Sequence, residues 1–500
     1  MATVTLHTPQ GVCTLYSQAG ETLHQVMTRA GVYHHAPCGG NGVCKNCLVR
    51  VCGEWVPPTK KEAEFLTDQQ LLDGFRYCCM AVPAGDCTVY LTDTADRCHE
   101  PTECFPTADV SRGHGYCVGI DIGTTTLAVY LYTPEGTCGA VRSCHNQQAV
   151  FGDDVISRIH AAQSPKALHQ MQTVVTGQLT ELIESVCRTA HIAPADITHG
   201  AIAANTTMLH LLTGLDPASI GQAPFTPLSL FGTMYRGEQL GLPLVCDVYL
   251  LPCISAYVGG DVTAGMVLCD MDVTHRTRLL IDVGTNGEMA LCHEGQIYCL
   301  ATAAGPAFEG AHISCGVGGV PGAICQMDEK GYQTIDGAPP VGICGSGLLD
   351  AVKFLLSKEI IDETGYMEEA FCLVPDTSLA ITPKDIREIQ LAKSAVCSGV
   401  LRLCELAHIE PSQIDKVYFA GGFGSHIDPK SAAAVGLIPT ELADKCCVAG
   451  NTAGLGAVQT ALSDRFLNRV ENLPQRVTYF ELSGDPRFNQ LFMENMLFEG

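Results

Sequence analysis

The first part of the chain carries a regular alternation of apolar and polar residues. Residues 2–8 and 12–17 both alternate and are separated by a turn at Gly11, which predicts a β-hairpin. Apolar residues at helical spacing then predict a helix over residues 21–30. Further apolar runs predict two more strands, over residues 43–51 and 87–91. The pattern therefore predicts a small module of strands and one helix that closes near Asp93.

Farther along, the pattern changes to apolar strands separated by long helices. One strand leads into Asp121-x-Gly-Thr-Thr and re-enters an apolar strand at 127–131. A second strand leads into Asp282-x-Gly-Thr-Asn and re-enters one at 288–291. Repetition of one unit at domain-scale spacing indicates an internal duplication, and helices interleaved with apolar strands favour mixed sheets covered on both faces. The two longest helical patterns lie over residues 167–191 and 384–408.

The sequence thus predicts an α/β and α+β multidomain protein. Residues 94–115 hold charges and prolines with little periodicity, and we interpret them as a linker. The predicted parts are a small N-terminal domain over residues 1–93, the linker over 94–115, and the first and second halves of a duplicated α/β domain over 116–278 and 279–500.

Composition limits the classes of function. Hydrophobic residues make up 46% of the 500 residues, as expected for a soluble α/β protein. A net charge of −24 argues against a nucleic-acid-binding or anionic membrane surface. No run reaches the ~18 apolar residues of a membrane-spanning helix, and the N-terminus lacks a signal-peptide pattern. In such a chain, 27 cysteines indicate a reducing cytoplasm and hint at an anaerobic habitat.

Four cysteines stand out by their spacing. Cys38, Cys44 and Cys47 come from one glycine-rich loop, and Cys79 follows farther on. Glycines allow such a loop to wrap a metal cluster with its N–H groups aimed at sulfur. The spacing predicts a [2Fe–2S] cluster of the plant ferredoxin type, with a first gap one residue longer than in that pattern. The hairpin, the helix and the Cys-rich loop also follow in the order of a β-grasp ferredoxin.

Alternatives to this interpretation stay open at this point. A zinc knuckle would more naturally give two short Cys pairs than three thiols from one loop. If these cysteines are instead scattered thiols of the core, their spacing carries no information about a metal cluster. The neighbouring Cys78 competes with Cys79 for the role of fourth ligand.

The two Asp-x-Gly-Thr segments have the residue types of phosphate-binding loops. Glycine lets the backbone approach a phosphate, while threonine hydroxyls and adjacent N–H groups donate to its oxygens. An Asp at a strand end can hold Mg²⁺ directly or through water. One loop alone could be an ordinary hairpin, whereas two could clamp opposite sides of one triphosphate. The candidate residues are Asp121, Gly123, Thr124, Thr125 and Thr126 in the first loop and Asp282, Gly284, Thr285 and Asn286 in the second.

A third glycine-rich turn follows an apolar strand near the C-terminal end. Gly421, Gly422 and Gly424 lack side chains where a flat adenosine would press on the backbone, although a tight strand–helix connection is an alternative. With the two loops, this turn resembles the adenosine motif of the superfamily of actin, sugar kinases and heat-shock chaperone ATPases. Segments 256–265 and 451–457 resemble its connecting helices. The resemblance implies a duplicated RNase H-like (actin-like) ATPase fold whose cleft closes on ATP and Mg²⁺.

A ferredoxin domain followed by this ATPase resembles the reductive activators of corrinoid proteins. Further stretches similar to that family occur at residues 204–212, 304–313, 342–350 and 481–488. The resemblance implies ATP-dependent one-electron transfer from a [2Fe–2S] cluster, which returns inactive Co(II) of a corrinoid protein to Co(I) in a methyltransferase system. It also implies an upstream low-potential electron donor and a homodimer. The family pattern favours Cys79 over Cys78 as the fourth cluster ligand.

Two residues near the expected cleft have open roles. Asp261 and Glu309 lie beside glycine-rich turns, and each either orients the water that attacks ATP or is structural. Two departures from the family are visible. Some members carry a further domain where this chain has the short linker. Others carry extra C-terminal cysteine clusters for [4Fe–4S] centres, whereas the pair Cys446-Cys447 is isolated here, which predicts one cluster.

Three other functions remain open. A redox-regulated small-molecule kinase of the same superfamily would need a catalytic carboxylate over a substrate hydroxyl. A dehydratase activator would also couple ATP to electron transfer, but with a [4Fe–4S] cluster bridging a dimer and no ferredoxin module. A non-enzymatic ATP-dependent scaffold would hold its cluster for structure alone. Cluster type and ATP-dependent electron transfer to Co(II) distinguish these functions.

Overall fold

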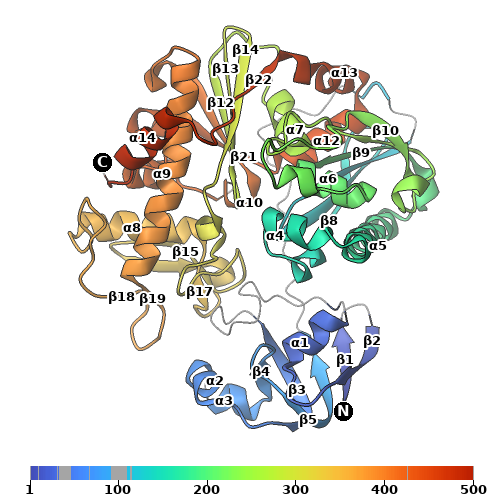
Figure 1. The fold of residues 1–500 in the computed structure, drawn as a ribbon, viewed down its shortest axis with the longest axis vertical. Coiled ribbons are helices and arrows are strands. Elements are labelled where there is room, and N and C mark those ends of the chain that lie inside the picture. Colours follow the sequence, from blue (N-terminus) through green and yellow to red (C-terminus); the bar gives the residue numbers. More distant parts are fainter. Residues whose placement is uncertain are drawn as a thin grey trace. The chain divides into compact units, whose positions relative to one another are not determined.

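The computed structural model describes residues 2–8, 11–30, 32, 47–66, 68–91, 110–112, 115–424 and 426–498. The chain divides into two compact units, which comprise residues 1–95 with 147–153 and residues 96–146 with 154–500. Figure 1 shows the strands and helices of the first unit in blue and those of the second from cyan to red.

The first unit is built on a five-stranded sheet. Its elements are β1 (Ala2–Thr8), β2 (Gly11–Ser17), α1 (Leu23–Arg29), β3 (Leu48–Trp55), α2 (Lys60–Phe65), α3 (Asp68–Leu72), β4 (Phe75–Tyr77) and β5 (Pro83–Tyr90). The strand order is β2-β1-β5-β3-β4, with β1 and β5 parallel. Helix α1 begins at a capping box, in which the side chain of Thr22 accepts from the Gln25 N–H and that of Gln25 accepts from the Thr22 N–H. Leu23 and Met27 of α1 then join the buried core.

The predicted hairpin, helix and returning strands are present in this unit. The prediction for the third strand was wrong at its end, because β3 continues from residue 51 to Trp55. Residues 43–46, where that strand was expected to begin, lie outside the described residues. The sequence pattern missed β4, α2 and α3, since segments this short show too few repeats of either period.

A buried ion pair fixes the strand that leads to Cys79. The Glu62 carboxylate accepts hydrogen bonds from Arg76 Nε and Nη2, both at 2.8 Å, and from the Tyr77 N–H at 3.0 Å. Glu62 is 0% exposed and Arg76 is 6% exposed. Water therefore cannot replace either partner, and the pair ties α2 to β4.

Removing one partner of this pair is expected to destabilise the first unit. Glu62→Leu leaves the Arg76 charge buried without its carboxylate, which typically costs about 3–5 kcal/mol. Trp55 is the single tryptophan and lies on β3, so its fluorescence during urea unfolding reports on this unit. The matched control is the double variant with Arg76→Met, which is expected to recover most of the loss. Equal losses in the single and double variants would contradict the interpretation.

The second unit contains two six-stranded sheets. The first half comprises β6 (Tyr116–Ile122), β7 (Thr126–Tyr132), β8 (Cys138–His145), α4 (Val155–Ala162), α5 (Pro165–Ala190), β9 (Ile197–Ala204), α6 (Thr206–Thr213), β10 (Thr233–Arg236), β11 (Asp247–Leu250) and α7 (Gly260–Leu268). The second half carries its main sheet on β12 (Arg278–Val283), β13 (Gly287–His293), β14 (Gln296–Thr302), β20 (Lys416–Ala420), β21 (Cys446–Gly450) and β22 (Val477–Tyr479).

The remaining elements of the second half surround its sheet. Small sheets are formed by β15 (Ala323–Asp328), β16 (Gly331–Thr334) and β17 (Gly342–Ile343), and by β18 (Phe371–Cys372) and β19 (Ala380–Ile381). The helices are α8 (Gly345–Ser357), α9 (Pro383–Leu406), α10 (Gly421–Gly424), α11 (Pro429–Val435), α12 (Thr452–Leu462), α13 (Asp464–Asn472) and α14 (Pro486–Glu494). The two long predicted helices are confirmed as α5 and α9.

Both main sheets share one topology. The order β8-β7-β6-β9-β11 in the first half matches β14-β13-β12-β20-β21 in the second. In each, the first three strands in sequence are antiparallel neighbours, and the next strand lies parallel to the first. The shared order confirms the duplication and the actin-like fold that the sequence predicted.

Two helices bind the halves of the second unit together. Helix α12 follows the second sheet but packs on the first, where a Cβ added to Gly119 of β6 would lie 2.6 Å from the Val458 backbone nitrogen. Helix α12 also meets α7 closely, because a Cβ added to Gly456 would lie 2.6 Å from the Ala264 Cβ. Glycine is therefore required by the close approach at both positions.

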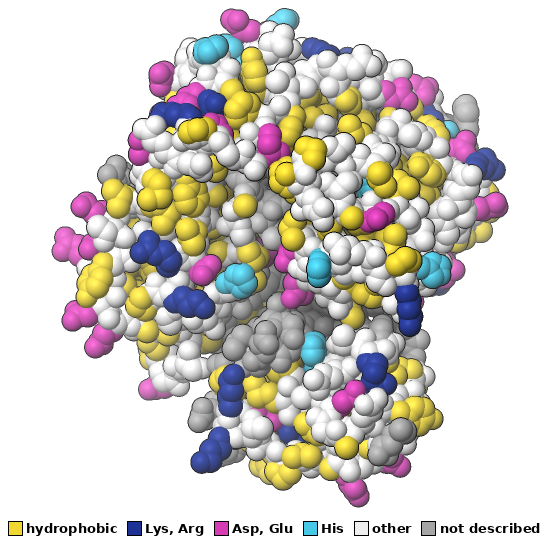
Figure 2. Space-filling model, in the orientation of Figure 1, with side chains coloured by type: hydrophobic (Ala, Val, Ile, Leu, Met, Phe, Trp, Pro, Cys, Tyr) yellow, Lys and Arg dark blue, Asp and Glu magenta, His cyan; other side chains and the backbone are white. Residues whose placement is uncertain are grey.

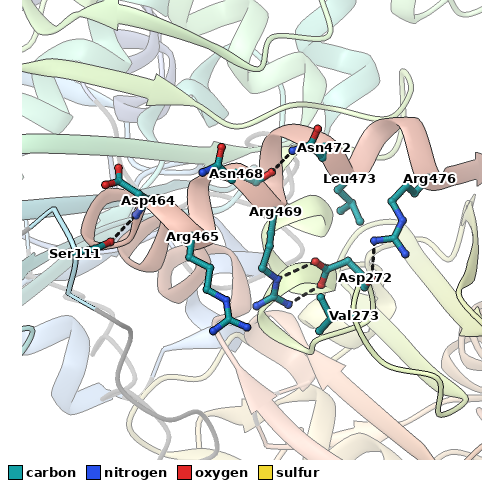
Figure 3. Close-up of a pocket in the computed structure, with 10 residues that line it drawn as sticks. All are labelled: Ser111, Asp272, Val273, Asp464, Arg465, Asn468, Arg469, Asn472, Leu473 and Arg476. Atoms are coloured by element: carbon teal, nitrogen blue, oxygen red, sulfur yellow. Dashed lines mark hydrogen bonds and ion pairs between the residues drawn. The ribbon is translucent and has the colours of Figure 1, made fainter.

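An open pocket of about 640 Å³ lies along α13 (Figure 3). Arg469 Nε and Nη2 donate to the two carboxylate oxygens of Asp272 at 2.8 and 2.6 Å, and Arg476 donates to the Asp272 carbonyl at 2.6 Å. The Asp464 N–H donates to Ser111 Oγ at 2.9 Å. These pairs hold α13 against the turn after α7 and against the segment before β6. The pocket is thus lined by groups that already stabilise the fold.

The surface of the second unit agrees with the acidic composition. Figure 2 shows Asp and Glu side chains spread over its visible face, in keeping with the net charge of −24. None of the helices in the described ranges has the length and hydropathy needed to span a membrane.

Candidate functional site

The two Asp-x-Gly-Thr segments occupy equivalent places in the two main sheets. Asp121 lies one residue before the end of β6, and Asp282 lies one residue before the end of β12. The charges of Asp261, Asp121 and Glu309 all act on the Asp282 carboxyl group. The structure therefore brings together the four acidic residues that the sequence singled out.

Burial makes these carboxyl groups hard to ionise. Desolvation raises the pKa of Asp121 to about 7, against a hydrogen bond from Asn451 Nδ2 at 2.7 Å that lowers it. Desolvation and the neighbouring carboxylates raise the pKa of Asp282 to about 7, and desolvation raises that of Asp261 to about 6. The pKa of Glu309 is raised by desolvation as well. A bound cation would favour the ionised forms, since an opposite charge lowers the pKa of a carboxyl group.

A fifth carboxylate belongs to this group and was missed from the sequence. Glu288 pairs with Asp282 across the β12–β13 hairpin, whereas Asp121 pairs with Ala128 in the first half. Burial, followed by the charges of Asp261 and Asp282, raises the pKa of Glu288 well above its usual range. The available signal was an ionisable residue at the start of an otherwise apolar strand.

The first loop is a tight turn between β6 and β7. The Gly123 N–H donates to the Thr126 carbonyl at 2.9 Å, and a Cβ at Gly123 would lie 2.8 Å from that same oxygen. Asn205 Nδ2 donates to Thr124 Oγ1 at 3.1 Å. The Thr125 carbonyl accepts from the backbone N–H of residue 146 at 2.7 Å. Of the five predicted residues of this loop, Gly123, Thr124, Thr125 and Thr126 thus form the turn, and Asp121 lies on β6 just before it.

Two buried side chains behind the first loop were also missed from the sequence. Asn146 follows β8 and Arg158 lies on α4, and both are 0% exposed. Each donates to a carbonyl oxygen of the loop, at Gly123 and Thr124 respectively. The signal for Arg158 was a charged residue at a position of α4 where the helical period places apolar residues.

The second loop is held by a carboxylate. The Gly284 N–H donates to the Asn286 carbonyl at 2.8 Å, which closes the turn. Thr285 Oγ1 donates to Glu309 Oε2 at 2.9 Å. Glu309 ends a short 3-10 helix over Pro306–Glu309. The structure therefore places Glu309 directly against one of the predicted phosphate-binding residues.

The glycine-rich turn lies beside the second loop. Gly421 has a φ of +81°, which residues with a side chain rarely adopt. In addition, a Cβ there would lie 2.3 Å from Asp282 Oδ1, so both the backbone conformation and the available space require glycine. A Cβ at Gly422 would meet no atom within 4 Å, while one at Gly424 would lie 3.2 Å from the carbonyl carbon of Phe419. The predicted adenosine turn thus lies directly against Asp282 of the second phosphate loop.

Two of the four predicted cluster ligands lie in the described part of the chain. The Sγ atoms of Cys47 and Cys79 are 3.3 Å apart, and the Cys79 N–H points at Cys47 Sγ at 3.5 Å. Two sulfur atoms bound to one tetrahedral metal ion with ~2.3 Å bonds lie about 3.8 Å apart. The distance between Cys47 Sγ and Cys79 Sγ is therefore close to that expected for two ligands of the same iron ion. Cys38 and Cys44 lie outside the described residues.

The rival residue, Cys78, has different surroundings. Its side chain is fully buried in the apolar core of the first unit, whereas Cys79 is half-buried at the edge of that core. Burial and the nearby Cys47 raise the pKa of the Cys78 thiol well above its usual range. A thiol that resists ionisation is a poor metal ligand, because the thiolate is the ligand form.

The acidic site suits a cation that binds water or phosphate oxygens in addition to these carboxylates. Carboxylate and hydroxyl oxygens are the donors that Mg²⁺ prefers, and Mg²⁺ usually retains several waters and binds phosphate oxygens. Among the residues that the structure describes, no group of three or more His, Cys, Asp or Glu side chains is arranged to hold a metal ion. Mg²⁺ at Asp121 or Asp282 would therefore complete its coordination with water and a bound triphosphate.

Sequence models of known families match almost the whole chain. A model of the 2Fe-2S iron-sulfur cluster binding domain matches residues 7–84. A model of the RACo middle region matches residues 116–274, and one of the C-terminal ASKHA domain of RACo matches residues 276–500. The name "middle region" therefore applies to the first half of the duplicated unit, and not to the segment between the two units.

Individual proteins match over similar lengths. The corrinoid activation enzyme RamQ of Eubacterium limosum is 34% identical over 420 residues, which cover 77% of this chain and 70% of RamQ. A [Co(II) methylated amine-specific corrinoid protein] reductase of Methanosarcina barkeri is 26% identical over 54% of this chain and 53% of its own length. The solved structure of a reductive activator for corrinoid, iron-sulfur protein superposes with a TM-score of 0.70 and 27% identity, over 99% of this chain and 98% of that one. Together with the ferredoxin-like unit and the duplicated ATPase fold, these matches show that the chain belongs to the family of reductive activators of corrinoid proteins.

Proposed function

We propose that this protein uses ATP to drive the transfer of one electron to the Co(II) of a corrinoid protein, which is thereby returned to Co(I). One observation carries the proposal: the chain combines the Cys47–Cys79 sulfur pair with a duplicated phosphate-loop site in a member of the activator family. The [2Fe–2S] cluster, when bound, supplies the electron. A low-potential donor must then reduce the cluster again, so that each Co(I) formed consumes one electron from that donor.

The cluster ligands in this proposal are Cys38, Cys44, Cys47 and Cys79. The position of Cys79 supports its role, because its sulfur is next to Cys47 while that of Cys78 is inside the core. A [2Fe–2S] cluster of the plant type has a potential near roughly −400 mV. Co(II) that keeps its lower axial ligand is harder to reduce. In a one-electron transfer, each ~59 mV of shortfall in potential lowers the equilibrium constant about tenfold.

The ATPase unit is proposed to overcome this shortfall. In the proposal it docks the corrinoid protein and stabilises a form in which cobalt has lost a ligand, which raises the potential of Co(II). Binding can shift that equilibrium only by its differential affinity for the two forms. ATP would then close the site and weaken the complex, so that the Co(I) protein is released.

We propose roles for the candidate residues at the nucleotide site. Asp121 and Asp282 are proposed to bind Mg²⁺ or its waters, and Asp261 to complete the acidic group beside them. Glu309 accepts a hydrogen bond from Thr285 Oγ1, which supports a role in holding the second loop, and we propose that it also orients the attacking water. The proposed phosphate and nucleotide contacts are Gly123, Thr124, Thr125, Thr126, Gly284, Thr285, Asn286, Gly421, Gly422 and Gly424.

Other parts of the proposal concern the whole protein. We propose domain boundaries at residues 93, 115 and 278. We also propose that the protein forms a homodimer. We further propose a cytoplasmic location, because a chain with 27 cysteines suits a reducing compartment.

The test is anaerobic reduction of a Co(II) corrinoid protein. The purified protein is reduced and mixed with the corrinoid protein, and the cobalt spectrum is followed before and after Mg-ATP is added. Formation of Co(I) that depends on ATP is the expected result. An unchanged cobalt spectrum, with an intact [2Fe–2S] spectrum and continuing ATP turnover, would overturn the proposal and favour a redox-regulated kinase.

A further inference from the structure

The two phosphate loops differ in the side chains that contact or flank them. The carbonyl oxygens of the first loop accept from a neutral amide and a guanidinium group, at Asn146 and Arg158. The second loop is flanked by two carboxylates: Glu288 pairs with Asp282 across the hairpin, and Glu309 accepts from the Thr285 hydroxyl. The duplicated fold makes this a direct comparison, because both loops connect the same two strands of the same topology.

Donors from behind the first loop bind three successive carbonyl oxygens. Asn146 Nδ2 donates to the Gly123 oxygen at 2.9 Å, and the Asn146 N–H donates to the Thr125 oxygen at 2.7 Å. Arg158 Nη2 donates to the Thr124 oxygen between them, also at 2.7 Å. The loop carbonyls are therefore tied to the protein interior.

This arrangement determines which groups the first loop offers to a ligand. A carbonyl oxygen carries partial negative charge and repels a phosphate, whereas N–H groups and hydroxyls attract it. The Gly123 N–H closes the turn on the Thr126 carbonyl. With the other carbonyls turned back, the N–H groups and hydroxyls of Thr124 and Thr125 are the donors that the loop can offer to the ligand. Arg158 also adds a positive charge, and low dielectric surroundings strengthen the attraction of a buried charge for an anion.

The second loop has no matching amide at the corresponding position. Leu127 pairs with Cys144, and Gly287 pairs with Thr302, so strand register aligns Asn146 with Ala304 two residues farther on. The same register aligns Ala128 with Glu288. The first loop thus has an amide donor at the position where the second has the methyl group of Ala304, and the second has a carboxylate, Glu288, where the first has Ala128.

We propose that Asn146 and Arg158 are positioning residues that hold the first loop with its hydroxyl groups and remaining N–H groups toward the triphosphate. The inference rests on the proposed ATP-dependent function. It names the residues that orient Thr124 and Thr125 for their contact with phosphate.

The test compares two ligands that share the base and ribose. The full chain with its cluster is titrated with a non-hydrolysable ATP analogue and with adenosine, in Mg²⁺, by displacement of a fluorescent nucleotide. Arg158→Met is expected to weaken the ATP analogue at least about tenfold, equivalent to about 1.4 kcal/mol, and to change adenosine binding by less than about twofold. Arg158→Lys keeps the charge and one donor, so it is expected to recover part of the loss.

Two further variants keep the result interpretable. Asn146→Ala removes the Nδ2 donor and is expected to show the same selectivity, which covers the case in which Arg158→Met does not fold. Met208→Leu is the matched control, because the Met208 sulfur contacts Arg158 Nη1 at 3.4 Å while its replacement leaves the loop bonds intact. It is expected to bind both ligands as the parent does.

Different results would contradict the inference and the proposed function. Equal weakening of both ligands, with no recovery in Arg158→Lys, would show that these residues only stabilise the fold and would overturn the inference. Unchanged binding of the ATP analogue in folded Arg158→Met would do the same. A parent protein that binds no ATP analogue would instead overturn the proposed function.

Discussion

Replacing Cys79 by serine is expected to abolish assembly of the [2Fe–2S] cluster, whereas replacing Cys78 by alanine is expected to leave it in place. The half-buried Cys79 has its sulfur 3.3 Å from that of the buried Cys47, whereas the Cys78 side chain is fully buried. Iron content and the visible absorption of the anaerobically purified protein measure the outcome. The Cys79 variant should hold almost no iron.

The Cys78 variant is the matched control for this expectation. It removes a thiol from the next position and is expected to cost about 1 kcal/mol through the small cavity left in the core. Its Trp55 fluorescence should report that loss while its iron content stays at the parent level. Loss of iron in the Cys78 variant with retention in the Cys79 variant would reverse the assignment of the fourth ligand.

Asp282→Asn is expected to lower ATP hydrolysis at least about a hundredfold and, in the same protein, to leave the nucleotide-free fold equally or more stable at pH 8. The loss of activity follows because the carboxylate that serves Mg²⁺ becomes neutral, and a preorganised charge of this kind is worth about 10²–10³ in rate. The stability follows because the carboxylate is buried beside Asp261, Asp121 and Glu309, whose charges oppose its ionisation.

The pH dependence of stability tests the same residue without any ligand. An Asp ionises at about pH 3.9 in an unfolded chain, whereas the pKa of Asp282 is about 7 in the folded protein. Between these values the folded state binds more protons than the unfolded state, so stability falls as pH rises through this window. The parent should therefore lose stability from pH 5.5 to 8, and Asp282→Asn should lose less.

Thermal unfolding of the nucleotide-free protein at the two pH values measures this difference. Mg²⁺ with a non-hydrolysable ATP analogue should restore the stability of the parent at pH 8 but not improve the variant to the same extent. A variant that unfolds earlier than the parent at pH 8 would show that Asp282 is needed for folding, and its lost activity would then carry no information on Mg²⁺.

The sequence predicted those features that depend on local pattern. Alternation located the first hairpin, and the repeated Asp-x-Gly-Thr segments located both phosphate hairpins and hence the duplication. The same local reasoning placed Gly421 at a turn, where its positive φ and the nearby Asp282 carboxylate exclude any side chain.

Features that depend on distant contacts were not predictable in this way. Arg158 and Asn146 act on the first loop from α4 and from the end of β8, and no local motif connects them to it. Glu288 becomes part of the acidic group only because strand pairing sets it opposite Asp282. The surroundings that separate Cys78 from Cys79 arise from packing of the whole first unit, and two adjacent cysteines in a sequence do not reveal which one faces inward.

The packing of α12 on the first sheet bears on how the protein is made. The face of β6 at Gly119 is covered by Val458, so during synthesis that face stays bare until nearly all of the chain has left the ribosome. At about 5–20 residues per second, the delay is on the order of 20–70 s. For that time a nascent chain exposes an apolar sheet that its own later helix must cover, and a chain cut before α12 would never cover it. Co-production of chaperones that protect the first half during translation is therefore expected to raise the yield of active protein.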